Sequence, residues 1–146
     1  MTRSDINKTM PKKKGFNLVE ILVVLVIIGT LAALAWPNYL SIKEKTLNRE
    51  AKANLALIRA AEKIYRIEQG FYYPYSATTS TVSDINSFLK LSLPESASAN
   101  WSINLDSTTS GSEFAQATRS ASDARVWKVE LSGEDDPACT GTYCSQ

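Results

Sequence analysis

The sequence predicts an α+β fold in which one long N-terminal α-helix packs against a small, three-stranded antiparallel β-sheet. Three observations predict this class. An almost unbroken apolar run extends from Ile21 to Trp36. A helical spacing of apolar and charged residues continues from there to Gln69. Three later segments alternate apolar and polar residues, as strands with one buried face do.

The first half of the predicted helix, residues 16–36, has the length of a membrane span. Its 21 residues make about 31 Å of helix, which matches a hydrocarbon core of about 30 Å. Lys12–Lys14 precede it, so the N-terminus is expected on the cytoplasmic side and the rest of the chain outside. Glu20 is the one carboxylate in this segment. An acid in a membrane segment is costly, so Glu20 is a candidate functional residue.

The residues around Glu20 suggest its partner. Lys12 to Glu20 reads KKKGFNLVE. If the peptide bond after Gly15 is cleaved, Phe16 gains a free α-amine within reach of a carboxylate four residues along. This junction resembles the N-terminal signal of the type IV pilin and pseudopilin family, which reads Gly, cleavage site, Phe, three residues, Glu. The family frequently has a proline where Pro37 stands in this chain.

The resemblance implies a pilin fold and a set of roles. Residues 1–15 would be a leader, with the true start possible at Met10, and Gly15 and Phe16 would be the processing site of a prepilin peptidase and N-methyltransferase. Glu20 would act in assembly. The protein would be a single-pass inner-membrane subunit that an assembly platform polymerises into a homo-oligomeric helical filament, with minor pilins as further partners. The filament would be an extracellular type IV pilus or, alternatively, a type II secretion pseudopilus or a competence system with this chain as minor pilin.

A different class of protein remains an alternative. Lys12–Lys14, the apolar run and the Ala33-Leu34-Ala35 motif before Trp36 would also suit an ordinary secretory signal peptide, followed by an exported periplasmic binding domain. Two features oppose this interpretation. Glu20 would be an unexplained charge inside the apolar region. The helical pattern also continues past the supposed cleavage site.

Residues 37–69 are predicted to form the amphipathic second half of the helix. Pro37 predicts a bend near Trp36–Tyr39, and Gly70 is the expected C-terminal cap. Glu62 and Arg66 have the spacing of an ion pair. The predicted buried face consists of Leu47, Ala51, Leu57, Ile58, Ala61, Ile64 and Tyr65. The opposite face, here named the basic stripe, consists of Lys52, Arg59, Lys63 and Arg66, and is expected either to be solvated or to meet the acidic head of a neighbouring subunit.

Residues 70–146 are predicted to form a globular head. A connecting segment, the αβ-loop of residues 71–99, contains a short helix with Ser83 as its N-cap. The buried side of that helix is predicted to be Ile85, Phe88, Leu89 and Leu91. The three strands are expected around Trp101–Leu105, Glu113–Arg119 and Trp127–Leu131, with Trp101 and Trp127 in the core. Such a small sheet needs the long helix for its stability.

The C-terminal segment contains the two cysteines of the chain, Cys139 and Cys144. A domain carried across a membrane reaches an oxidising compartment, so we expect a disulfide loop here, with two free thiols as the alternative. Glu134, Asp135 and Asp136 precede it. They form either a solvated acidic loop or, as the resemblance to secretion pseudopilins implies, ligands for calcium. No other metal and no cofactor are expected.

Composition excludes several functions. At 146 residues the chain has room for one modest domain, and it contains no histidine, which rules out histidine-based acid–base catalysis and histidine metal ligands. Removal of residues 1–15 would leave 11 basic and 14 acidic residues, a net charge of −3. Such a balance does not indicate a nucleic-acid partner. The sequence therefore predicts a structural protein and not an enzyme.

Overall fold

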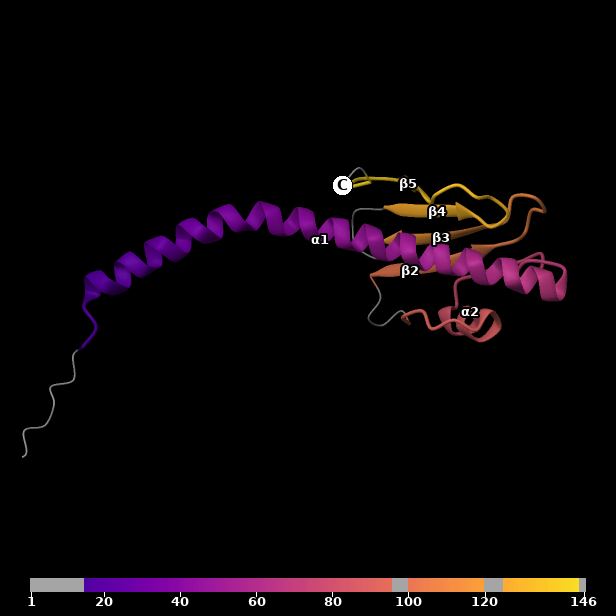
Figure 1. The fold of residues 1–146 in the computed structure, drawn as a ribbon, viewed down its shortest axis with the longest axis horizontal. Helices are drawn as coiled ribbons and strands as arrows, with labels where there is room; N and C mark the ends of the chain where they lie inside the picture. The colour runs from indigo at the N-terminus through magenta and orange to yellow at the C-terminus, as the bar shows by residue number, and fades with distance from the viewer. Residues whose placement is uncertain (1–14, 96–99, 120–124, 145–146) are drawn as a thin grey trace, which may run out of the picture. The chain divides into compact units, whose positions relative to one another are not determined.

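The computed structural model describes residues 15–95, 100–119 and 125–144 (Figure 1). The leader that the sequence predicts, with Met10 and Lys12–Lys14, lies outside the described residues except for Gly15. The chain divides into two compact units, Met1–Tyr39 and Leu40–Gln146. The elements in chain order are α1 (Leu18–Gln69), β1 (Thr78–Thr79), α2 (Val82–Leu89), β2 (Trp101–Asp106), β3 (Phe114–Arg119), β4 (Val126–Glu130) and β5 (Ala138–Thr140).

Helix α1 begins and ends at residues that the local chemistry explains. Asn17 caps its N-terminus, because its side-chain Oδ1 accepts a hydrogen bond from the amide of Val19 at 3.3 Å. At the other end Gly70 has a φ of 87°, and its amide donates to the carbonyl of Arg66 at 2.8 Å. The predicted cap at Gly70 is therefore confirmed. The helix continues through Pro37, and the predicted bend there stays a prediction.

The head contains a five-stranded antiparallel sheet in the order β1-β2-β3-β4-β5, and not the predicted three strands. The three predicted strands correspond to β2, β3 and β4. The two additional strands lie at the edges and have two and three residues. Their shortness explains the error, since so few residues cannot display an alternating pattern.

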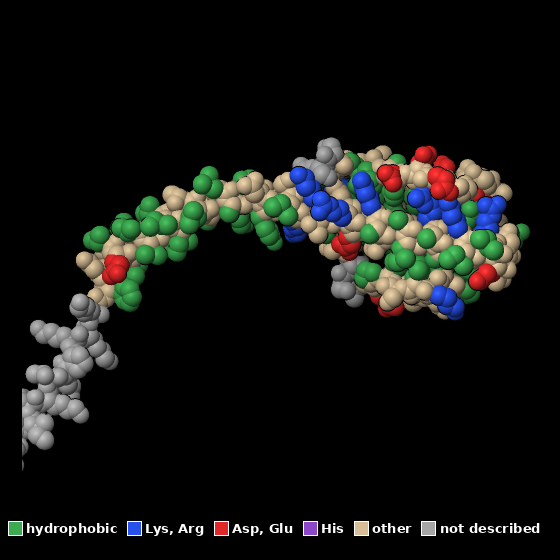
Figure 2. Space-filling model, in the orientation of Figure 1, with side chains coloured by type: hydrophobic (Ala, Val, Ile, Leu, Met, Phe, Trp, Pro, Cys, Tyr) green, Lys and Arg blue, Asp and Glu red, His purple; other side chains and the backbone are tan. Residues whose placement is uncertain are grey.

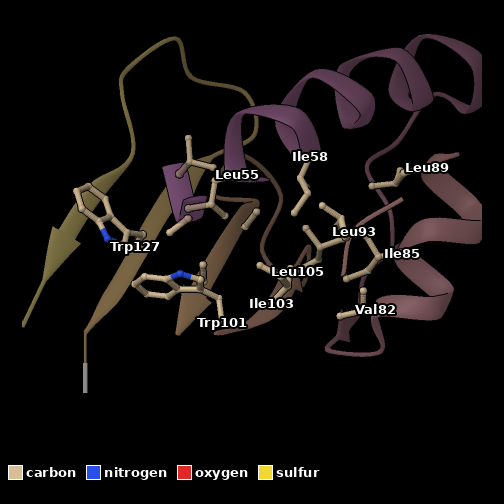
Figure 3. Close-up of a cluster of buried hydrophobic side chains, with 14 of the residues drawn as sticks. Leu55, Ile58, Val82, Ile85, Leu89, Leu93, Trp101, Ile103, Leu105 and Trp127 are labelled. Atoms are coloured by element: carbon tan, nitrogen blue, oxygen red, sulfur yellow. The ribbon is translucent and has the colours of Figure 1, made fainter. Parts of the chain in front are cut away.

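The second half of α1 lies along one face of this sheet and covers the core (Figures 1 and 3). Leu47, Ala51, Leu55 and Ile58 supply the helix side of the core. On the central strand β3, Ala117 lies opposite both Ile103 and Trp127. A small residue between two large ones leaves room for their side chains beneath the helix. Trp101 and Trp127 are buried, as predicted.

The buried face of α1 is rotated from the predicted one. Leu57 and Ile64 were expected inside, but they are 47% and 60% exposed. Leu55 and Glu62 are fully buried instead. Asn48, Leu55 and Glu62 are spaced by seven residues and therefore lie on one stripe of the helix. The predicted buried face did not include this stripe, two of whose three members are polar.

Helix α2 also differs in detail from its prediction. It begins at Val82, and its N-cap is Thr81, two residues before the predicted cap at Ser83. Val82, Ile85 and Leu89 are buried, whereas Leu91 is half-buried. Phe88, predicted to be buried, is 51% exposed and stacks on Tyr73 with ring centroids 4.6 Å apart.

The rotated face of α1 gives a direct test. Leu55→Ala should lower the free energy of unfolding by about 2–5 kcal/mol, because it opens a cavity in a closed core. Leu57→Ala is the matched control, and its exposed position should limit its effect to about 0.5 kcal/mol. Thermal unfolding of the full-length protein in detergent micelles, followed by the near-ultraviolet circular dichroism of the tryptophans, measures both. Equal effects of the two substitutions would contradict the observed face.

Candidate functional site

The bond between Gly15 and Phe16 lies outside regular structure. Both residues precede α1 and are exposed, with Phe16 81% exposed. A Cβ atom added to Gly15 would meet nothing within 4 Å. Among the described residues, therefore, no side chain or backbone crowds the junction. A protease needs an extended and accessible segment of this kind.

Glu20 lies in the first turn of α1. The amide groups of a helix N-terminus carry partial positive charge, so this position favours a carboxylate. Glu20 is exposed, and the two ion pairs found among the described residues, Lys63–Glu134 and Arg125–Glu44, do not involve it. Figure 2 shows one acidic side chain among the hydrophobic ones of this half of the helix. The carboxylate is thus available to a partner.

The surface around Glu20 is apolar on every side of the helix. Large side chains from Leu18 to Trp36 are 45–77% exposed, and α1 is the one described helix with the length and composition to cross a membrane. None of the residues in its most apolar window is buried. A helix without a polar face requires lipid or other apolar helices around it.

Asn17 is a functional candidate that the sequence prediction missed. In addition to its side-chain cap, its carbonyl accepts hydrogen bonds from the amides of Glu20 at 3.0 Å and Ile21 at 3.3 Å. This contact fixes the start of the helix two residues after the candidate cleavage site. An asparagine directly before an apolar run is a recognised start signal, so the pattern was available in the sequence.

In the head, the basic stripe binds the same chain's C-terminal loop. Lys63 forms an ion pair with Glu134, and the guanidinium of Arg59 donates to the backbone carbonyl of Asp135 at 2.5 Å. The Lys52 ammonium lies 4.5 Å from the ring centroid of Trp127. The stripe is therefore not simply solvated, because Lys63 and Arg59 contact the acidic loop of their own chain. Its contact with a neighbouring subunit stays a prediction. Contacts between residues more than 70 positions apart could not be read from the sequence.

The same contacts bear on the candidate calcium ligands Glu134, Asp135 and Asp136. Within the described residues, no three acidic, cysteine or histidine side chains are grouped as metal ligands would be. The Lys63 ammonium already satisfies the Glu134 carboxylate, and its hydrogen bond and charge lower the pKa of Glu134. A calcium ion here would have to displace this cation. The geometry favours an acidic loop that is tied to α1 by its own chain.

A buried cluster of polar groups joins α1 to the other end of the sheet. Arg125 is fully buried and donates to the Asn48 Oδ1 atom at 2.7 Å and to Glu44 at 2.5 Å. The Asn48 amide in turn donates to the carbonyl of Tyr143 at 3.0 Å. A buried guanidinium must be paired, so these bonds fix α1 against β4 and the C-terminal loop. Nothing in the sequence indicated Arg125.

Cys139 and Cys144 form a disulfide in the structure. Cys139 belongs to β5, and its partner residue on β4 is Trp127. The loop that the disulfide closes therefore holds Tyr143 next to the Arg125 cluster. The centroid of the Tyr143 aromatic ring lies 5.8 Å from the guanidinium carbon of Arg125. The disulfide therefore lies at the edge strand β5, next to the buried polar cluster of Arg125 and Asn48.

Glu62 is a buried ionisable group of α1. It does not pair with Arg66 as predicted, because Arg66 donates to the Tyr72 hydroxyl at 2.9 Å. Instead the Glu62 Oε2 atom accepts a hydrogen bond from the amide of Tyr73 at 2.9 Å. Burial raises the pKa of Glu62 from 4.5 to about 7. This carboxyl group anchors the segment that follows the helix.

Comparison with known proteins supports the importance of the N-terminal junction. Residues 10–36 match the family described as the prokaryotic N-terminal methylation motif. The chain is 34% identical over 71 residues to the type IV major pilin protein PilA of Myxococcus xanthus, which covers 49% of this chain and 32% of that protein. It is 39% identical over 61 residues to the type II secretion system core protein G of Escherichia coli, 42% of each chain.

A second core protein G, from Pseudomonas aeruginosa, is 40% identical over 63 residues, which cover 43% of this chain and 44% of that protein. The chain thus spans about a third to less than half of the length of these relatives. No solved structure gives a significant match.

The raised pKa of Glu62 predicts a pH dependence of stability. In the unfolded chain this carboxyl ionises near pH 4.5, whereas in the folded head it keeps its proton up to about pH 7. The stability that it contributes is therefore fully present below pH 4.5 and is lost as the pH rises through 7, by at most about 3 kcal/mol. Glu62→Gln should remove this slope and raise the melting temperature at pH 8. The exposed Glu68→Gln is the control, and a parental slope in Glu62→Gln would contradict the assignment.

Proposed function

We propose that this chain, which carries the N-terminal methylation motif and is similar to both type IV pilins and type II secretion core pseudopilins, is a structural subunit of a helical filament. One observation carries the proposal. A helix that is apolar on all sides has a single carboxylate in its first turn, directly after an open Gly15–Phe16 junction. These features have no use in a soluble monomer. Each has a use in a subunit that is cleaved, held in a membrane and then polymerised.

Processing is the first step of this function. A membrane peptidase cleaves after Gly15 and methylates the new amine of Phe16. The absence of a side chain at Gly15 leaves the bond accessible, and Asn17 keeps the helix from extending into it. The processed subunit stays in the inner membrane through residues 16–36, with its N-terminus on the cytoplasmic side and its head outside.

Assembly follows from the chemistry of the apolar helix. Moving it from lipid into a bundle of identical helices exchanges one apolar environment for another, so it costs little hydrophobic free energy. The Glu20 carboxylate then pairs with the Phe16 amine of a neighbouring subunit. In a low dielectric this pairing is strongly favoured over an unpaired charge, and it sets the register between subunits.

Two kinds of filament remain candidates. The disulfide at the C-terminal edge of the sheet, and the internal ion pair where calcium would bind, favour a type IV pilus. The identities of 39% and 40% to two core proteins G favour a type II secretion pseudopilus. Deletion of the gene separates them: loss of surface fibres indicates a pilus, and loss of protein secretion indicates a pseudopilus. A minor pilin of a DNA-uptake system would leave both intact and reduce transformation.

The processing site yields a prediction with a matched control. The mature N-terminus should be Phe16, and Gly15→Val should block cleavage because the side chain crowds the peptidase and not the protein itself. Gly29→Val introduces the same side chain at another position with nothing within 4 Å, and should be cleaved normally. Intact mass of the membrane-extracted proteins measures this. A mature chain that starts at Trp36 would instead establish a secretory signal peptide.

The role of Glu20 is tested separately from processing. Glu20→Gln should be inserted and cleaved like the parent but should yield few or no filaments, because the Phe16 amine of a neighbour then lacks its partner. Glu95→Gln removes an exposed carboxylate of the head and is the control. Sheared surface fractions, probed for the subunit, report filament yield. Parental yield from Glu20→Gln would refute the pairing.

A further inference from the structure

A polar cleft lies where α1 ends against the loop between β2 and β3, and the filament function does not use it. Its volume is about 300 Å³. Arg66, Phe71 and Tyr75 line it from the helix end and the following segment, and Thr108, Ser110 and Glu113 line it from the loop. All of these residues belong to the head unit.

One wall of the cleft consists of aromatic side chains that are held in place by a further aromatic ring, Tyr65. The rings of Phe71 and Tyr75 lie with their centroids 4.8 Å apart, and Tyr65 packs edge-on against Phe71 at 6.0 Å. Tyr75 nevertheless remains 72% exposed. A tyrosine held in place but left open presents a flat apolar face with a hydroxyl at its edge.

The other walls supply charged groups in fixed positions. Arg66 is held by its bond to the Tyr72 hydroxyl, with its guanidinium carbon 4.7 Å from that ring's centroid, and it has no ion pair within the described residues. The Glu113 Oε2 atom accepts a hydrogen bond from the amide of Gly111 at 3.0 Å. The cleft thus contains a donor that is always charged and a carboxylate acceptor.

The loop that closes the cleft is also fixed. The amide and hydroxyl of Thr108 both donate to the Asp106 carboxylate, at 2.9 and 2.7 Å. The amide of Ser107 donates to the carbonyl of Ala77 at 2.9 Å, which ties the loop to the segment after α1. The hydroxyls of Thr108 and Ser110 are therefore presented on a preorganised frame, which lowers the entropic cost of binding a ligand.

From this combination we infer that the cleft binds a saccharide. A sugar ring has an apolar face that stacks on an aromatic ring and a rim of hydroxyls that both donate and accept hydrogen bonds. Arg66 and the Ser110 hydroxyl donate to that rim, while Glu113 and the Thr108 hydroxyl oxygen accept from it. A simple anion fits less well, because the Glu113 carboxylate repels it. An apolar peptide side chain fits less well, because hydroxyls and charges form most of the lining. The inference is independent of the filament function.

Saturation-transfer NMR on the full-length protein tests this inference. Micelles of a detergent without a sugar headgroup avoid competition for the cleft. The probes are methyl α-mannoside, methyl β-galactoside, N-acetylglucosamine and N-acetylneuraminic acid. At least one should receive saturation on the ring protons of one face, with a dissociation constant on the order of millimolar for such an open site. Tyr75→Ala should weaken binding about tenfold.

Two further variants make the result specific. Glu113→Gln keeps the shape of the cleft and should also weaken binding, because a charged acceptor is replaced by a neutral one. Tyr39→Ala removes a tyrosine that is 63% exposed outside the cleft, and should bind like the parent. Unchanged near-ultraviolet circular dichroism verifies that the variants are folded.

Three outcomes would overturn the inference. The first is the absence of saturation for all four probes. The second is equal binding to the parent and to Tyr75→Ala. The third is a shift of the amide resonances of Thr108 and Ser110 by inorganic phosphate but by none of the saccharides, which would make the cleft an anion site.

Discussion

The rest of the structure depends on the fact that one helix must satisfy two environments. The first half of α1 has no polar face and no buried residue in its apolar window, so water cannot be its surroundings. The second half gives one face to a sheet that is too small to be stable alone. Because both halves belong to one continuous helix, the element that completes the core of the head also carries the apolar segment.

Buried polar groups determine which face of α1 packs against the sheet and in which register. Apolar side chains on α1 would tolerate small shifts of register, but Asn48 and Glu62 each require particular partners. They lie two turns to either side of Leu55, on the same stripe of the helix. Buried polar pairs contribute little net stability, and their better-attested effect is to exclude alternative packings. In this head, Asn48 and Glu62 explain why the face of α1 that packs against the sheet is not its most hydrophobic face.

The sequence could predict the features that depend on neighbouring residues, but not those that depend on contacts between distant ones. Gly15, Phe16 and Glu20 lie close together in the sequence, so their pattern could be recognised from it. The end of α1 and the strands β2 to β4 could be predicted from local propensities and alternation. The burial of Glu62 was not predicted, because local rules favour an exposed carboxylate paired with Arg66. The ion pair of Lys63 and Glu134, and the cleft between Arg66 and Glu113, join residues far apart in the chain. Only the folded arrangement brings these groups together.

The cap at Asn17 has an electrostatic consequence for a cleaved chain. A new ammonium at Phe16 would lie one residue before a helix start whose amides already carry partial positive charge. Two positive ends would then share one small region of low dielectric, and each chain would carry its own unfavourable potential there. The Glu20 carboxylate lies in the first turn of the same helix, where the amides also attract it. If the chain is cleaved and assembles as proposed, a carboxylate that a second chain brings to this region would lower the electrostatic potential of both chains. The isolated subunit would then be the electrostatically frustrated state, and association would relieve it.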